Sequence, residues 1–376
     1  MATQLLRLVS NQLKVGTALP FGVRDEHGKL LLARGQVIYN DRQLAVLLDR
    51  GLYADQEELR AYTEGRAPPV DAQRQRLTLF DLWDQSAHRL ERLHKSIDEP
   101  GFSARCDEFA EQLMELVQRD TDIAIFLSVR QDARRLPLYG LTHALHTALV
   151  CQLMSHRVGW TLDRGLCLVK AALTMNMLIT ELQGRVAAIG RITEVQREQI
   201  QSHPQRVAER LRAAGVVDEE WLQTVLQHHE RPGGGGYPNK LAAVSESAAA
   251  LRMADVFMAK ISPRADRPAL SIQDAARQMF AEAKGSPAAA AIIKEYGIYP
   301  PGNVVQLVSG EQAVVIRRGA AAQSPIVAAI TDKSGMPTVA TQRRDTAQPG
   351  YGIKALATDL SLVQRVPPER LFGLAE

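Results

Sequence analysis

Apolar residues recur every three or four positions along most of the chain between residues 77 and 297. That spacing places them on one face of an α-helix. It is clearest in residues 77–97, 142–159, 165–182, 193–215, 218–229, 246–261 and 271–283. We therefore predict amphipathic helices over 77–117 and a nearly all-helical region over 124–297. The apolar stripe on the 77–117 helices is typical of a packing face or a dimerisation face, and it is the reason to expect a homodimer.

Both ends of the chain show a different pattern, in which short apolar runs alternate with polar residues and turn signals. Near the N-terminus we predict a hairpin around Asp25–Gly28 and a short helix over 41–50 that Asn40 caps. Near the C-terminus the alternation predicts strands within 303–318, 325–340 and 359–366. The predicted fold is therefore mainly α, with a small N-terminal α/β or β-rich module and a short C-terminal β-rich segment.

These patterns divide the chain into four predicted regions. They are a β-rich module at 1–62, a linker with amphipathic helices at 63–123, a helical domain at 124–297 and a β-rich extension at 298–376. A polar, proline-containing segment near 63–76 marks the linker.

Composition narrows the function classes. A formal net charge of +3 over 376 residues, with no basic run, argues against a nucleic-acid partner. No segment approaches 18 consecutive apolar residues and the N-terminus lacks a signal-peptide run, so we expect a cytoplasmic protein without a membrane span. Cys106, Cys151 and Cys167 are scattered without CxxC spacing, which predicts reduced core residues.

The candidate chemistry lies in the helical region. It consists of one carboxylate on an apolar helix and four histidines, namely Asp255, His143, His203, His228 and His229. Imidazole is the commonest protein ligand for borderline metals, and facing helices of a bundle can project ligands to one point. A single histidine on an apolar face is usually a satisfied core residue. The pattern alone leaves a metal site and a packed core equally open.

Two of these histidines, His228 and His229, are adjacent and precede four glycines. Neighbouring residues of a regular helix point about 100° apart, so both can reach one site only at a helix end or by binding two metals. The glycines permit a tight turn that approaches a ligand closely. A loose surface loop is the alternative.

The segment "HHERPGGGGYPNKL", residues 228–241, resembles the signature of the HD-GYP family, whose usual form is HHE-R-x-D-G-x-G-Y-P. These are bacterial phosphohydrolases that open cyclic di-GMP. His143, His203-Pro204 and Asp255 match further family motifs in the right order, and the resemblance covers about 124–300. The resemblance implies an HD-domain-like helical bundle that binds iron or manganese. The metal ligands that it implies are His143, His203, His228, His229 and Asp255, and the substrate contacts are Gly236, Tyr237, Pro238, Arg264 and Arg267.

The chain departs from the family at the centre of the chemistry. Met175 and Asn176 stand where the family has its His-Asp pair, and Ile179 stands where it has a lysine. A thioether is a poor ligand for iron(II) or manganese(II). A neutral amide brings no charge to hold two dications together. Gly233 and Met258 also replace family acids. We therefore expect the two-metal centre to be missing or badly weakened, which leaves the catalytic residues unknown and one reduced metal site or none.

Three functions are compatible with this sequence. The favoured one is a binding or scaffold protein of cyclic di-GMP signalling without phosphodiesterase activity, with cyclic di-GMP and a signalling protein as partners. The second is an active metal-dependent phosphodiesterase that uses the remaining ligands. The third is a protein-interaction module that uses the N-terminal module and the 77–117 helices without binding a nucleotide.

The other polar residues near these motifs are less specific. His146 could replace a lost ligand or pack between helices. Glu230 could bind a metal, support a histidine or be a solvated charge. The remaining histidines, expected to be exposed, are His27, His88, His94 and His156.

Overall fold

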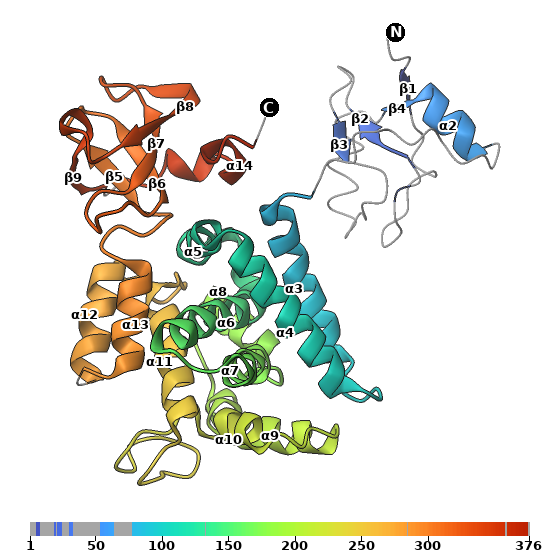
Figure 1. The fold of residues 1–376 in the computed structure, drawn as a ribbon. Helices are drawn as coiled ribbons and strands as arrows, with labels where there is room; N and C mark the ends of the chain where they lie inside the picture. The colour runs from blue at the N-terminus through green and yellow to red at the C-terminus, as the bar shows by residue number, and fades with distance from the viewer. Residues whose placement is uncertain are drawn as a thin grey trace. The chain divides into compact units, whose positions relative to one another are not determined.

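A computed structural model describes residues 5–7, 19, 21–24, 30–32, 53–63, 77–131, 133–283, 285–357 and 359–374. The chain divides into two compact units, residues 1–76 and 77–376 (Figure 1). The finer division into four regions remains a prediction.

The first unit contains a small antiparallel sheet with the strand order β1-β4-β2-β3. Its elements are β1 (Leu5–Arg7), β2 (Val23–Arg24), β3 (Leu30–Leu32), β4 (Tyr53–Asp55) and helix α2 (Gln56–Thr63). β2 pairs with β3, which confirms the predicted hairpin. The predicted helix over 41–50, its cap Asn40 and the turn Asp25–Gly28 lie outside the described residues.

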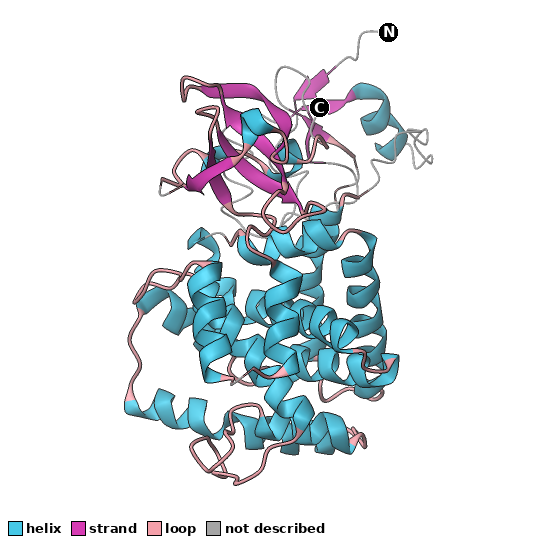
Figure 2. Cartoon of the chain, turned by 60° about the vertical axis from the view of Figure 1, so that its left-hand side comes forward, coloured by secondary structure: helices cyan, strands magenta, loops and turns pink. Residues whose placement is uncertain are grey.

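The second unit begins with a helical bundle, as the periodicity predicts (Figure 2). Its helices are α3 (Leu79–Lys95), α4 (Phe102–Arg119), α5 (Thr121–Val129), α6 (Tyr139–Val158), α7 (Leu162–Thr174), α8 (Thr180–Ile189), α9 (Glu194–Ala213), α10 (Glu219–Gln227), α11 (Glu246–Ile261), α12 (Ile272–Glu282) and α13 (Pro287–Tyr296), with a 3₁₀ turn η2 (Ala133–Leu138). Helix α6 is buried along most of its length and packs against α3, α7, α11 and α13. The predicted class, a mainly α bundle with β-rich flanks, is confirmed.

The apolar stripe on α3 and α4 is a packing face within the chain. Trp83, Leu90 and Phe109 are all buried against the rest of the bundle. Because the chain itself covers the stripe, the stripe gives no support to the predicted homodimer. The three cysteines are buried and free, as predicted.

The chain ends in a five-stranded antiparallel sheet with the order β8-β7-β6-β5-β9. Its strands are β5 (Val304–Leu307), β6 (Gln312–Arg317), β7 (Ile326–Thr331), β8 (Pro337–Asp345) and β9 (Ile353–Leu356), and the short helices η3 (Pro349–Tyr351), η4 (Val363–Arg365) and α14 (Pro368–Leu371) complete the segment. The strand predicted within 359–366 is wrong. Asp359 Oδ1 accepts the Ser361 N–H at 2.8 Å and starts a turn that leads into η4.

This sheet packs against the bundle through an aromatic cluster. The rings of Phe80, Phe126 and Phe372 lie 5.1–6.3 Å apart between centroids. Arg318 adds bonds to Asp122 at 2.6 Å and to Glu295 at 3.0 Å. The contacts fix α5 and α13 to the sheet. Among the described helices, none is both long and apolar enough to cross a membrane.

Candidate functional site

Three of the predicted ligands converge. His203 comes from the middle of α9, and His228 and His229 come from the end of α10, with ligand-type atoms all within 4.8 Å of one another. His228 is the C-terminal cap of α10, so the chain leaves the helix between the two adjacent histidines. This helix end lets both side chains reach one point, which a regular helix does not allow.

Hydrogen bonds set the tautomers of two of these rings. The Nδ1 atoms of His203 and His228 lie 2.6 Å from the carbonyl oxygens of Ile200 and Val225. A carbonyl only accepts, so each Nδ1 carries a proton and the neutral ring keeps its lone pair on Nε2. The two Nε2 atoms face each other at 3.2 Å.

These rings are held in the neutral form. Burial lowers the pKa of His203 to about 3, and burial also lowers the pKa of His228 and of His229. Two unprotonated nitrogens at 3.2 Å repel each other unless a cation lies between or beside them. An imidazole that donates Nδ1–H to a carbonyl and presents Nε2 is the usual arrangement of a metal ligand. The donor set therefore fits a metal ion.

The other two predicted ligands form a pair of their own. His143 Nε2 lies 2.7 Å from Asp255 Oδ1, and both side chains are buried. Burial opposes ionisation of the Asp255 carboxyl, but the hydrogen bond and charge of His143, with His229 and His228 nearby, lower its pKa overall. All five predicted ligands therefore lie in one buried region, three as a cluster and two as a pair.

The two positions that the resemblance assigns to the family's His-Asp pair are buried. Met175 caps α7 and Asn176 begins the turn toward α8, and their exposed fractions are 0% and 3%. Asn176 Oδ1 is buried and has no hydrogen-bond partner among the described residues. Ile179 is also buried. These three residues bring apolar side chains and one neutral amide, and none of the three is a carboxylate or a cation.

The glycine-rich turn is folded tightly onto the histidines. The Glu230 carboxylate is buried and accepts the backbone N–H of Asn239 at 2.6 Å and of Leu241 at 3.1 Å. The Tyr237 ring stacks on the His229 ring with centroids 4.6 Å apart. A side chain at Gly236 would place its Cβ 2.4 Å from Glu230 Cα, so the close approach requires glycine. Pro238 follows Tyr237 through a cis peptide bond and is half-buried.

Glu230 thus holds the turn in place. We expect Glu230→Ala to lower the free energy of unfolding by about 3 kcal/mol, since two charge-assisted hydrogen bonds are lost. Amide hydrogen exchange at Asn239 and Leu241 should accelerate. The matched control is Glu198→Ala on the exposed face of α9. Unchanged exchange at both amides would show that the carboxylate does not hold the turn.

The two arginines that the resemblance assigns to substrate are occupied by the protein itself. Arg264 lies over the Tyr139 ring at 4.9 Å and donates Nη2–H to its hydroxyl at 2.7 Å. Tyr139 in turn stacks on His143 with centroids 5.2 Å apart. Arg267 donates to the Ala259 carbonyl of α11. Arg264 is therefore linked to the site through Tyr139, a residue that the sequence analysis missed although it lies four residues before His143.

The exposure of the remaining histidines depends on how their helices pack. His146 is buried and stacks on Trp83 at 5.9 Å, which confirms the packing alternative. His156 is exposed as predicted, and His27 lies outside the described residues. The expected exposure is wrong for His88 and His94, which are half-buried because α3 packs on the bundle. His94 Nε2 lies 2.9 Å from the Leu173 carbonyl, two residues before Met175.

The burial of His94 predicts that the free energy of unfolding depends on pH. Burial lowers its pKa from 6.5 to about 4. Because the unfolded chain takes up this proton first, the free energy of unfolding should fall as the pH drops from 6.5 toward 4. Denaturant unfolding across that range should give a shallower slope for His94→Gln than for the wild type, while His156→Gln keeps the full slope. Equal slopes for His94→Gln and the wild type would contradict this.

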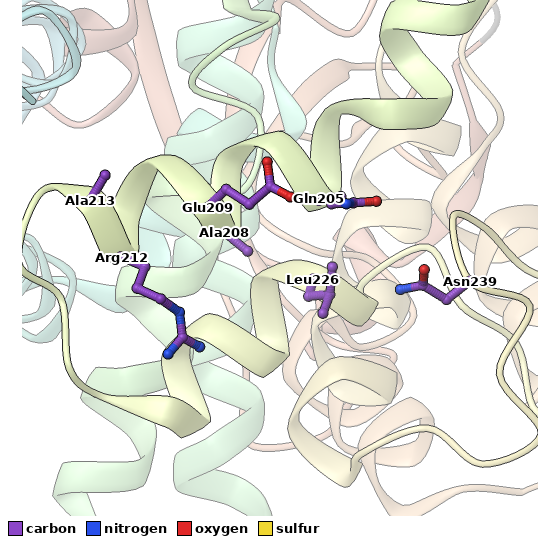
Figure 3. A pocket seen from close by; sticks show the side chains of 7 residues that line it. All are labelled: Gln205, Ala208, Glu209, Arg212, Ala213, Leu226 and Asn239. Atoms are coloured by element: carbon purple, nitrogen blue, oxygen red, sulfur yellow. Dashed lines mark hydrogen bonds between the residues drawn. The ribbon is translucent and has the colours of Figure 1, made fainter.

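An open hollow lies on the outer face of α9 and α10, with a volume of about 560 Å³ (Figure 3). It is lined by Gln205, Ala208, Glu209, Arg212, Ala213, Leu226 and Asn239. No ligand-type histidine lines it. Asn239 connects it to the glycine-rich turn.

Residues 142–286 match the family model of the HD domain. The cyclic di-GMP phosphodiesterase PA4108 of Pseudomonas aeruginosa is 34% identical over 134 residues, which are 34% of this chain and 32% of that protein. Residues 142–286 therefore form an HD domain, and they are similar to a domain of a cyclic di-GMP phosphodiesterase. The chain spans about a third of the length of that relative.

A solved structure is similar to a larger part of the chain. Bd1817, an HDGYP protein from Bdellovibrio bacteriovorus, matches 77% of this chain and 99% of its own, with a TM-score of 0.48 and 12% identity. Within the HD domain defined above, His143, His203, His228, His229 and Asp255 all fall inside the matched range 142–286. So do Met175 and Asn176, the residues that the resemblance places at the family's His-Asp pair.

Proposed function

We propose that this HD-GYP-type domain binds cyclic di-GMP beside a single metal ion, without the two-metal hydrolysis of its family, and acts as a binding or scaffold protein in cyclic di-GMP signalling. One observation carries the proposal. Three imidazoles converge, with the Nε2 lone pairs of His203 and His228 facing each other, while Met175 and Asn176 bring no carboxylate to bridge a second ion.

The metal, iron or manganese, would be held by His203, His228 and His229. When bound, it would neutralise charge on phosphate oxygens. The carbonyls of Ile200 and Val225 orient two of the rings for this task. Tyr237, stacked on His229, offers an aromatic face at the edge of the same site.

A second metal ion lacks a place in this arrangement. Hydrolysis by two metals depends on ions about 3.5–4 Å apart that act on both oxygens of the displacement. At that distance two dications repel strongly unless a bridging anion offsets their charge. Asn176 is neutral, Met175 is packed in the core, and the Asp255 carboxylate is engaged by His143. The chain's own residues therefore support ligand binding better than hydrolysis.

The choice of cyclic di-GMP rests on the family resemblance and on the activity named for the Pseudomonas relative. Calorimetric titration of the full chain, loaded with manganese(II) under anaerobic conditions, should show saturable binding of cyclic di-GMP. The double variant His228→Ala/His229→Ala should lose it, and His156→Ala should retain it. A folded, metal-loaded protein that shows no affinity for cyclic di-GMP would overturn the proposal.

A further inference from the structure

His143 and Asp255 form a buried pair outside the three-histidine cluster. His143 Nε2 lies 2.7 Å from Asp255 Oδ1, and the two residues are 3% and 7% exposed. An ionised carboxylate only accepts hydrogen bonds, so at this distance Nε2 carries a proton and donates it. His203 and His228 have the opposite tautomer, because their Nδ1 atoms donate to backbone carbonyls. The Nε2 atom of His143 therefore presents a proton, whereas the Nε2 atoms of those two rings present a lone pair.

The second ring nitrogen of His143 faces Tyr139. The two rings stack with centroids 5.2 Å and planes 15° apart, and the Tyr139 hydroxyl lies 3.5 Å from His143 Nδ1. Both residues belong to α6 and are four positions apart, the spacing at which side chains on one helix face meet. A neutral imidazole with its proton on Nε2 keeps its lone pair on Nδ1, where it can accept from this hydroxyl.

Arg264 fixes the direction of these hydrogen bonds. It follows the end of α11, and its Nη2 donates to the Tyr139 oxygen at 2.7 Å. A guanidinium has donors only, so the Tyr139 oxygen accepts from Arg264 and the hydroxyl hydrogen is left for another acceptor. His143 Nδ1 is an acceptor within reach of that hydrogen. The contacts therefore run from donor to acceptor in one direction, from Arg264 inward to the buried carboxylate of Asp255.

We infer that His143 is a positioning residue that holds Asp255 and does not bind a metal. Tyr139 and Arg264 keep it in this role. To bind a metal through Nε2, the ring would have to give up its bond to Asp255 and move its proton to Nδ1. The resemblance instead places His143 among the metal ligands and Arg264 at the substrate. The inference deepens the proposed function and rests on it for the metal, because it leaves the single ion to the three-histidine cluster.

The same substitution at two histidines tests whether His143 binds the metal. A glutamine amide can donate an N–H to a carboxylate, as His143 Nε2 does, but its nitrogen offers no lone pair to a metal. In the full chain equilibrated with manganese(II), His143→Gln should keep the metal content of the wild type, whereas His228→Gln should lose it. Loss of the metal from a folded His143→Gln protein would overturn the inference.

The tautomers can be measured without metal, which separates this inference from the proposed function. In the full chain with isotopically labelled histidine, heteronuclear NMR should show a protonated Nε2 for His143 and a protonated Nδ1 for His203 and His228. Tyr139→Phe should shift only the His143 Nδ1 resonance, and the control Tyr351→Phe in η3 should shift none of the three. A protonated Nδ1 on His143, or a His143 resonance that Tyr139→Phe leaves unchanged, would overturn the inference even if no metal binds to the wild type.

Melting temperatures separate positioning from simple packing. Without metal, His143→Leu fills the buried position but leaves the Asp255 carboxylate without its donor, which destabilises the folded state. His143→Gln restores a donor, so it should melt at a higher temperature than His143→Leu. Equal melting temperatures for the two variants would show that His143 only fills space and would overturn its positioning role.

Discussion

Replacing His228 by alanine is expected to abolish metal binding by the HD domain. The side chain is fully buried, its Nδ1 is fixed by the Val225 carbonyl, and its Nε2 faces that of His203 at 3.2 Å. Removing it leaves two imidazoles, too few to hold a divalent ion in competition with water. The affinity should fall by more than the roughly 10- to 100-fold that changes in outer-shell partners cause.

Anaerobic equilibrium dialysis against iron(II) and manganese(II), followed by elemental analysis, measures this effect. His156→Ala is the matched control, because His156 is exposed on α6. Circular dichroism should show that the metal-free His228→Ala protein remains folded. The substitution removes one of the two facing Nε2 lone pairs and so relieves their repulsion. Full metal content in a folded His228→Ala protein would mean that the three histidines do not form the metal site.

Restoring the family's pair is expected to change the stoichiometry. The double variant Met175→His/Asn176→Asp should raise the metal content from about one to about two ions per chain, because an anionic bridge offsets the repulsion between two dications. Without metal the new carboxylate is buried and uncompensated, at positions that are 0% and 3% exposed in the wild type. We expect the metal-free variant to be less stable by about 3–5 kcal/mol.

The measurement is the melting temperature of each protein with and without metal. Manganese(II) should stabilise the double variant far more than the wild type, since the ions bind only the folded state. Met177→Leu, a buried neighbour in the same turn, controls for disturbance of the core. Unchanged metal content in a folded double variant would show that Met175 and Asn176 do not occupy the positions of the family pair.

The sequence predicted the helical bundle because helical periodicity is a local pattern, and it singled out three histidines that the structure brings together. The start of α9 is also set locally, by a capping box between Thr193 and Gln196. The histidine positions follow from a motif of fixed spacing. The strand expected within 359–366 failed because a side-chain cap at Asp359, followed by a proline at 367, favours a turn over strand pairing.

The features that sequence analysis missed are those created by tertiary packing. His94 looked like a surface residue on an amphipathic helix, yet α3 brings it to the Leu173 carbonyl of α7. The sequence left three roles open for Glu230. The structure shows a fourth, in which the carboxylate accepts hydrogen bonds from two backbone amides of the turn.

In the proposed function, the three-histidine cluster is the functional part of the site. Three neutral imidazoles in a buried cluster destabilise a protein unless they have a partner. A single metal ion, as proposed above, would satisfy the three imidazoles.

Turnover is the most direct test of this account. The full chain, purified anaerobically and loaded with iron(II) or manganese(II), is incubated with cyclic di-GMP, and linear pGpG and GMP are measured by chromatography. We predict that cyclic di-GMP is bound and recovered intact. Product that forms with the wild type and disappears with His228→Ala/His229→Ala would contradict the account and show that three histidines suffice for hydrolysis.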